Sequence, residues 1–189
     1  MSWTTPIAPT EAGPRVTPVY ESIRARSSRH EVSQIWQTLA SDPEVLAGAF
    51  DHYNRLLSDP APLSLAQAQL IALVVSATNG CGYCVSHVGP RLAAMMSDEL
   101  ARSVARDYRE ANLTARDRVL LDAAVALTCE PSERKAEDVE RLREYGFDDA
   151  GIVRATAIAA YYNFINRCVS ALGVDLELGL EAWEFGAQR

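Results

Sequence analysis

Two of the four cysteines, Cys81 and Cys84, lie three positions apart in the stretch from Asn79 to His87. A disulfide needs Cβ atoms about 3.5–4.5 Å apart, and residues i and i+3 in the first turn of a helix can reach that distance. The free amide groups and the dipole of a helix N-terminus stabilise a thiolate and lower its pKa. The spacing therefore predicts a dithiol that can be oxidised and reduced reversibly.

The residues around the two cysteines support this chemistry. Asn79-Gly80 is a helix-breaking pair, and it precedes the first cysteine directly. His87 follows Cys84 by three positions, so its ring can lie on the same helix face as that sulfur. The stretch therefore combines an attacking thiolate, a resolving thiol and a nearby proton carrier.

Other interpretations of the motif compete with redox chemistry. A c-type haem site needs a histidine directly after the second cysteine, where this chain has Val85. A structural zinc site needs four ligands, and the remaining cysteines and histidines show no paired spacing, so no metal and no cofactor are expected. The remaining alternative is that the two cysteines are buried in a helix turn and have no chemical role.

Composition limits the class of protein. The chain has 189 residues, enough for one domain with a sizeable core, and is 48% hydrophobic and 23% charged. Its net charge of -7 argues against nucleic acid or an anionic membrane as the main partner. The first residues lack the basic start and apolar stretch of a signal peptide, and no apolar run approaches the ~20 residues of a membrane span. We therefore expect a cytoplasmic protein, where a C-x-x-C is more often catalytic than structural.

Hydrophobic periodicity predicts an all-helical fold. No stretch alternates convincingly with a period of two. Ser64 and Gln67 form the pattern of a capping box, and Gly146 and Gly173 are placed to end helices. The expected helices start near Pro18 and otherwise cover 33–39, 43–57, 84–96, 100–108, 119–127, 136–145 and 152–172. A further long helix is expected to start at Leu63-Ser64 and to lead to the dithiol.

The chain divides into three parts. Residues 1–17 contain three prolines and four threonines and are expected to form an extended N-terminal arm. Residues 18–175 contain the helical domain. Residues 176–189, which include Trp183, are expected to dock on the body or on a neighbouring subunit.

At the dithiol the chain resembles the AhpD-like superfamily, which contains carboxymuconolactone decarboxylases and a peroxidase-related alkylhydroperoxidase branch. The resemblance rests on the run from Ala68 to His87 and on two later stretches, 145–149 and 162–167. It covers roughly residues 15–175. It implies an all-helical bundle that assembles as a homo-oligomer, as a dimer, trimer or hexamer.

The resemblance also implies an activity, the reduction of hydroperoxides in antioxidant defence. By position, Cys84 would be the peroxidatic cysteine and Cys81 the resolving one. A dithiol reductant, a lipoyl or thioredoxin-like protein, would then restore both thiols.

The family's proton relay is altered in this chain. Its glutamate, twelve residues before the first cysteine, is Gln69 here, and its histidine, four residues after the second cysteine, is Val88. We expect His87 to serve as the nearby base and Gln69 to orient a water or a sulfur. General acid–base catalysis contributes about 10²–10⁴-fold, so a weakened relay would give a slow peroxidase.

Two further functions remain open at this point. The same dithiol could serve a general thiol–disulfide oxidoreductase, or a redox-sensing helical module without catalysis.

The other cysteines, methionines and histidines are not expected to form a site. Cys129, Cys168, Met95 and Met96 are expected to pack in the interior, and His30 and His52 to lie on the surface. Asn163, Asn166 and Arg167 interrupt an apolar helix and would need polar partners if buried.

Overall fold

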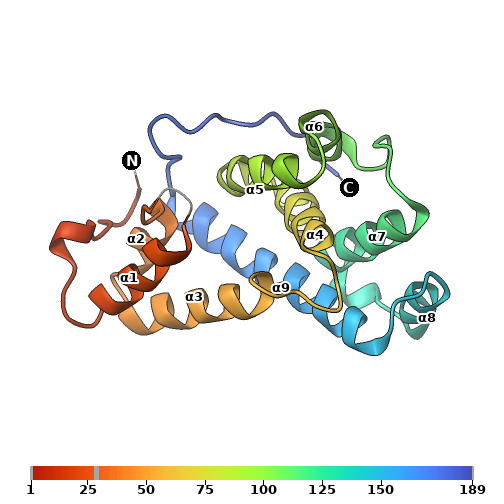
Figure 1. The fold of residues 1–189 in the computed structure, drawn as a ribbon, viewed down its shortest axis with the longest axis horizontal. Helices are drawn as coiled ribbons and strands as arrows, with labels where there is room; N and C mark the ends of the chain where they lie inside the picture. The colour runs from red at the N-terminus through yellow and green to blue at the C-terminus, as the bar shows by residue number, and fades with distance from the viewer. Residues whose placement is uncertain (1, 28–29, 189) are drawn as a thin grey trace.

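The fold was described from a computed structural model, which covers residues 2–27 and 30–188. Within those ranges the chain forms nine α-helices, two single 3-10 turns and no strand (Figure 1). The all-helical prediction is confirmed. The helices are α1 (Thr17–Arg26), α2 (Gln34–Leu39), α3 (Pro43–Leu57), α4 (Leu65–Thr78), α5 (Gly82–Met95), α6 (Asp98–Asp107), α7 (Ala115–Cys129), α8 (Ala136–Glu144) and α9 (Asp149–Leu172).

Helix α4 lies at the centre of the molecule. Its residues from Ala68 to Thr78 are all buried, as expected for a helix that is apolar on every side. It packs against α5, α6, α7 and α9. The predicted capping box begins it: the Gln67 amide donates to Ser64 Oγ, and the Ser64 amide donates to Gln67 Oε1, each at 3.1 Å.

Helices α1, α2 and α3 form a layer at the N-terminal end, and α9 crosses the molecule beneath α4 and α5 (Figure 1). Asp42 caps α3 by accepting from the amides of Glu44 and Val45. Helix α9 runs for 24 residues and ends at Gly173, whose φ of 60° lies in the left-handed region. Because α9 packs against both α3 and α4, it connects the N-terminal layer to the central helices.

The C-terminal strap, residues 174–188, contains no α-helix and runs along one side of α5 and α6 (Figure 1). Trp183 is buried, and its amide donates to Ser86 Oγ at 3.0 Å. The buried Gln188 donates to the carbonyl oxygens of Val104 and Ala105. The strap therefore docks on the body of its own chain.

Some details of the sequence prediction are wrong. Met95 and Met96 are 46% and 39% exposed at the end of α5, and Cys129 is exposed at the end of α7. Each lies in the last turn of its helix or just beyond it, where helical periodicity no longer determines which side chains are covered. Among the residues that the structure describes, no helix is long and apolar enough to cross a membrane.

Candidate active site

The two cysteines occupy the turn between α4 and α5. Asn79 ends α4, and Gly80 has a φ of 69°, a conformation that glycine adopts without strain. The Cys81 amide then donates to the Ser76 carbonyl at 2.9 Å, which directs the chain back over the end of α4. Helix α5 therefore begins two residues earlier than predicted, with Cys81 at its N-cap and Cys84 in its first turn. Both thiols are free, and they are only 3% and 5% exposed.

The two thiols have opposite shifts in acidity. A hydrogen bond with the Cys84 side chain is the largest effect on Cys81, and it lowers the pKa of that thiol. Burial acts in the opposite direction, whereas the Cys84 amide and the Asn166 side chain lower the pKa further. Burial raises the pKa of the Cys84 thiol well above its ordinary value, and the neighbouring Cys81 raises it further. Cys81 is therefore the more acidic thiol of the reduced pair and Cys84 the less acidic one, a distinction that the sequence pattern does not make.

Asn166 on α9 connects this turn to the rest of the fold. Its Nδ2 donates to Ser76 Oγ at 3.2 Å, and its Oδ1 accepts from Asn79 Nδ2 at 3.0 Å. Asn79 also donates to Asn163 Oδ1. The polar residues of α9 thus find their partners within the same chain, and Asn166 interacts with both sulfurs as well. The dithiol turn is held by hydrogen bonds between residues that are 84 to 90 positions apart in sequence.

His87 is bound by a carboxylate of the C-terminal strap. Its Nε2 lies 2.7 Å from Glu177 Oε2, and both side chains are less than one-fifth exposed. The Tyr83 hydroxyl donates to Glu177 Oε1 at 2.8 Å, and the Gln34 amide donates to the same oxygen at 2.7 Å. The rings of Tyr83 and His87 have their centroids 4.5 Å apart.

Glu177 is ionised in this arrangement. Burial alone raises its pKa, but the hydrogen bond and charge of His87, with the Gln34 amide and the Tyr83 hydroxyl, outweigh burial and lower it to about 2. An ionised carboxylate only accepts hydrogen bonds, so Nε2 of His87 carries the hydrogen. The other ring nitrogen, Nδ1, is then the atom free to accept or give a proton. Burial and the charge of Glu177 also raise the pKa of Tyr83.

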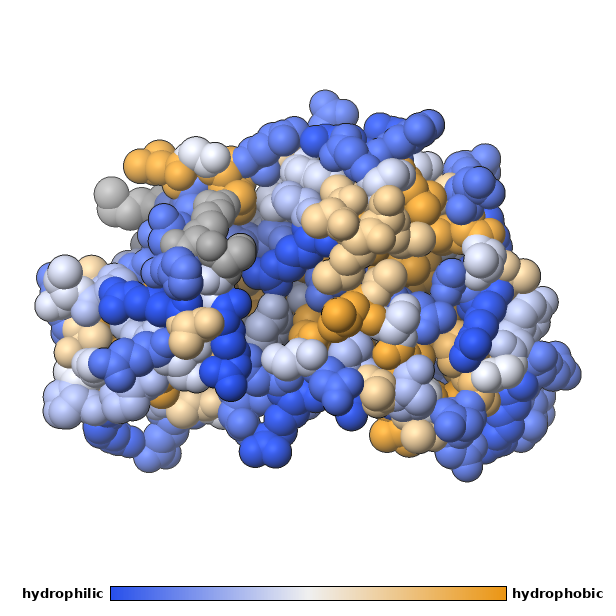
Figure 2. All heavy atoms as spheres, in the orientation of Figure 1, coloured by the Kyte–Doolittle hydropathy of each residue, from blue (hydrophilic) through white to orange (hydrophobic). Residues whose placement is uncertain are grey.

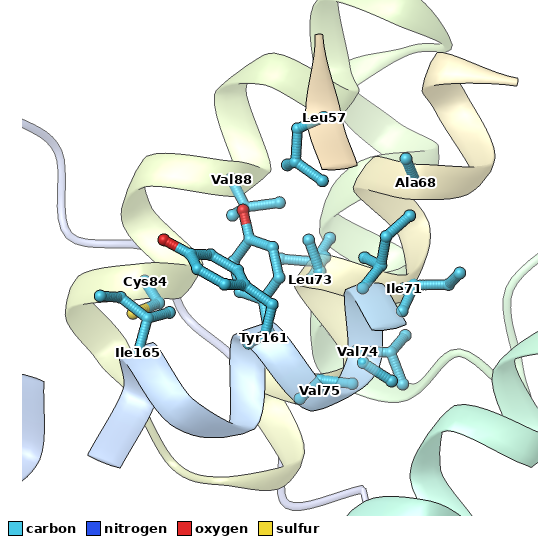
Figure 3. Packing of buried hydrophobic residues seen from close by; sticks show 14 of the residues in the cluster. Leu57, Ala68, Ile71, Leu73, Val74, Val75, Cys84, Val88, Tyr161 and Ile165 are labelled. Carbon is cyan, nitrogen blue, oxygen red and sulfur yellow. The ribbon is translucent and has the colours of Figure 1, made fainter. Parts of the chain in front are cut away.

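Cys84 lines a cavity of about 110 Å³ together with His87 and Val88. Apolar and aromatic side chains from the N-terminal layer and α9 surround it, and Figure 3 shows Cys84 close to Ile165, Val88 and Tyr161. This aromatic cavity is lined in particular by Trp36, Phe50, Tyr53, Tyr83, Tyr161 and Tyr162. It gives a small, apolar molecule access to the Cys84 sulfur.

Gln69 lies on a second cavity, of about 540 Å³, which Cys84 does not line. We call it the polar cavity, since Ser86, Arg91, Asn54 and Glu177 line it as well. Gln69 is 4% exposed, and its Oε1 has no hydrogen-bond partner among the described residues. His87 lines both cavities. The structure thus brings Cys81 and Cys84 together and places His87 on the same cavity as Cys84, whereas Gln69 lines the polar cavity.

Sequence reasoning missed Glu177. It lies in an irregular segment, 90 positions after His87, and outside the stretches that resemble a known family. Apart from Tyr83, which directly precedes Cys84, the aromatic wall was missed as well, because it combines side chains of α2 and α3 with those of α9. Within residues 2–27 and 30–188, no group of three or more His, Cys, Asp or Glu side chains could hold a metal ion.

Comparison with known proteins agrees with the fold. The model of the carboxymuconolactone decarboxylase family matches residues 43–99, which include α3, α4 and α5. No curated protein matches the sequence significantly.

Solved structures match nearly the whole chain. A peroxidase-related protein with an alkylhydroperoxidase AhpD core, from Ralstonia eutropha, has a TM-score of 0.86 at 24% identity, covering 95% of this chain and 94% of that one. A peroxidase-related protein from Silicibacter has a TM-score of 0.81 at 28% identity, covering 94% and 90%. The debrominase Bmp8, solved as a cysteine-to-alanine variant with 2,3,4-tribromopyrrole, has a TM-score of 0.78 at 18% identity, covering 94% and 95%. The family match over residues 43–99 and the fold shared with the peroxidase-related proteins support assignment of the chain to the AhpD/carboxymuconolactone decarboxylase superfamily.

Proposed function

We propose that the protein is a thiol-dependent hydroperoxide reductase of antioxidant defence, with Cys84 as the peroxidatic and Cys81 as the resolving cysteine. The observation that carries this proposal is the position of Cys84. Its thiol lines an apolar cavity beside a carboxylate-bound histidine, and it contacts a second thiol of lowered pKa. A nucleophile, a base and a group that orients the base are the parts that covalent catalysis needs.

In the first step the Cys84 thiol gives its proton to the Cys81 thiolate and attacks the terminal oxygen of the hydroperoxide. The S–O bond forms, the O–O bond breaks, and the alkoxide leaves as an alcohol with the proton on His87 Nδ1, which is the proton that the Cys81 thiol released when it ionised. Glu177 holds the ring and stabilises its protonated form, as a carboxylate does for a catalytic histidine. Cys84 is now a sulfenic acid.

In the second step Cys81 attacks the Cys84 sulfur. The S–S bond forms, the S–O bond breaks, and hydroxide leaves as water with the proton that Cys81 had received. The sum is one hydroperoxide and two thiols giving one alcohol, one water and one disulfide. A dithiol reductant then restores both thiols by exchange.

The burial of both sulfurs favours this function over general thiol–disulfide exchange. A folded protein disulfide cannot reach thiols that are 3% and 5% exposed unless the site opens, whereas a small hydroperoxide fits the cavity. For the same reason a slender lipoyl group suits the site better as reductant than the surface of a thioredoxin-like protein. The sensor alternative predicts a disulfide that is not recycled quickly, so measured turnover with a dithiol reductant would exclude it.

A second candidate reaction is reductive dehalogenation. The aromatic walls of the cavity suit a flat halogenated ring, and a structural neighbour is a debrominase. Cys84 would take the bromine, Cys81 would then displace bromide to form the disulfide, and a proton would replace bromine on the ring carbon. The two reactions share the dithiol and are separated by comparing turnover of cumene hydroperoxide with that of a bromopyrrole.

Steady-state turnover of cumene hydroperoxide with dihydrolipoamide tests the proposal. We expect Cys84→Ser to abolish turnover and Cys81→Ser to stop the protein at the sulfenic acid, which dimedone traps. Cys129→Ser is the matched control, since Cys129 is exposed and lines neither cavity. An unchanged rate in Cys84→Ser, with circular dichroism showing an intact fold, would end the proposal.

A further inference from the structure

The aromatic cavity and the polar cavity meet at a common rim. His87, Arg91 and Tyr53 line both of them, as do Arg26 and Glu31 from the N-terminal layer. Figure 2 shows the surface hollowed between the N-terminal helices and α5. A ligand that enters here therefore meets an apolar compartment with Cys84 on one side and a polar compartment with Gln69 on the other.

The aromatic cavity sets the size of the apolar part of the ligand. Its volume of about 110 Å³ is on the order of the ~150 Å³ apolar cavities that accept a benzene ring. Aromatic side chains favour edge-to-face and offset contacts with such a ring. The compartment that holds the Cys84 sulfur thus suits one small ring rather than a long chain.

Arg91 lies at the rim and uses one of its N–H donors on another side chain. Its Nη1 donates to the Tyr53 hydroxyl at 2.6 Å, and in the part of the chain that the structure describes it makes no ion pair. Arg26 uses one donor on Ser22 of its own helix. Glu177, in the polar cavity, already binds His87 and Tyr83. A guanidinium group with open positions matches the two oxygens of a carboxylate.

Two polar atoms at the polar cavity have no hydrogen-bond partner among the described residues. Gln69 is buried, and its Oε1 is unpartnered; Asn54 Oδ1, on the same cavity, is also unpartnered. Buried polar atoms normally have a partner, so an amide oxygen without one marks a place for a ligand or water that carries donors. A carboxylate carries no donor, so these two amide oxygens mark a place for water, and Arg91 is the feature that indicates an anionic group at the rim.

We propose that the substrate is an amphiphile, an aryl hydroperoxide whose ring occupies the aromatic cavity and whose carboxylate binds Arg91. This inference rests on the proposed hydroperoxide reductase activity and adds a substrate class to it. The ring would carry the hydroperoxide toward Cys84 and His87, and Arg91 would fix its orientation from the rim. Specificity then depends on an arginine that takes no part in the chemistry.

The test compares 4-(2-hydroperoxypropan-2-yl)benzoate with its methyl ester and with unsubstituted cumene hydroperoxide. We expect the wild-type protein to have a kcat/KM about 10–100-fold higher for the acid than for the ester, the range that a charged hydrogen bond supplies. Arg91→Gln should remove this preference by slowing the acid alone, and Arg91→Lys should restore part of it. Arg24→Gln is the control, because Arg24 is exposed on α1 and lines neither cavity.

Binding gives a readout that does not depend on turnover. 4-Isopropylbenzoate lacks the reactive group, and calorimetry on Cys84→Ser should show it binding at least tenfold more tightly than its methyl ester. Equal affinities, or equal kcat/KM for acid and ester in the wild-type protein, would overturn the substrate class while cumene hydroperoxide turnover leaves the proposed function standing. No turnover of any of the three hydroperoxides would instead overturn the proposed function.

Discussion

The dithiol turn and the C-terminal strap meet at His87 but are encoded in different ways. The turn is local: Gly80, Cys81 and Cys84 lie within five residues, and the chemistry follows from their spacing at the start of a helix. The strap reaches His87 from 90 positions away, without a helix and without a recognisable motif. A nucleophile can thus be identified from a short stretch of sequence, whereas the group that orients its base comes from tertiary structure.

The largest expected effect comes from removing the charge that the strap supplies. Glu177→Gln keeps the shape of the side chain but cannot stabilise a protonated His87, so turnover should fall by about 10²-fold or more. The loss should appear in kcat rather than KM, measured in the hydroperoxide assay at several pH values. Glu184→Gln, an exposed strap residue, is the matched control. Equal rates in both variants would show that the strap does not contribute to the chemistry.

Undocking the strap should give nearly as large an effect. Trp183 is 5% exposed, and Arg102 lies over its ring at 4.3 Å. Replacing it by alanine should cost about 3 kcal/mol of unfolding free energy, as for other buried tryptophans, and should lower turnover with it. Denaturant unfolding and the peroxide assay measure the two effects.

Gly89→Ala should disturb the contact between Trp183 and α5 by changing α5 instead of the strap. A Cβ at position 89 would lie 2.3–2.6 Å from atoms of the Trp183 ring, so the ring must move. We expect it to reproduce the loss of activity seen in Trp183→Ala. If either variant keeps full turnover, His87 does not need the docked strap.

The dithiol turn should respond more weakly to a backbone change. Gly80→Ala places a side chain at a φ of 69°, which costs about 1–2 kcal/mol, while no atom lies within 4 Å of the added Cβ. Stability should fall by that amount, with the dithiol still able to form its disulfide. Thermal unfolding and the disulfide content after oxidation check this. A much larger loss of unfolding free energy would mean that the turn also supports the packing of the core.

The smallest effect concerns pH. Because the pKa of Glu177 falls from 4.5 in the unfolded chain to about 2 in the fold, its stabilisation is complete above pH 4.5 and is lost as the pH drops towards 2. The difference in unfolding free energy between wild type and Glu177→Gln should therefore shrink over that window. Urea titrations from pH 6 to pH 3 measure it, and a constant difference would contradict the ion pair.

Much of the fold could be predicted because its signals are local. The Ser64–Gln67 capping box, the Asp42-Pro43 start of α3 and the glycine end of α9 all act over a few residues, and each is seen in the structure. The positions of Cys81, Cys84 and His87 on one short helical stretch could be expected for the same reason.

The remainder depended on contacts between distant segments. Gln69 stands at the sequence position of a relay residue, yet its side chain lines the polar cavity. Its position in the sequence determines which face of α4 it occupies, but the packing of distant segments determines which cavity lies next to that face. The difference in acidity between Cys81 and Cys84 depends on the hydrogen bond between the two thiols and on their burial by the rest of the fold. Met95 and Met96 were expected inside and lie exposed where α5 ends.

The most direct test of the account is a single turnover. Reduced protein is mixed with one equivalent of cumene hydroperoxide, and free thiols are counted with time. We expect the loss of two thiols within seconds in wild type and in Cys129→Ser, no rapid loss in Cys84→Ser, and a much slower loss in Glu177→Gln. Loss over hours in the wild-type protein, no faster than that of a free cysteine, would contradict it.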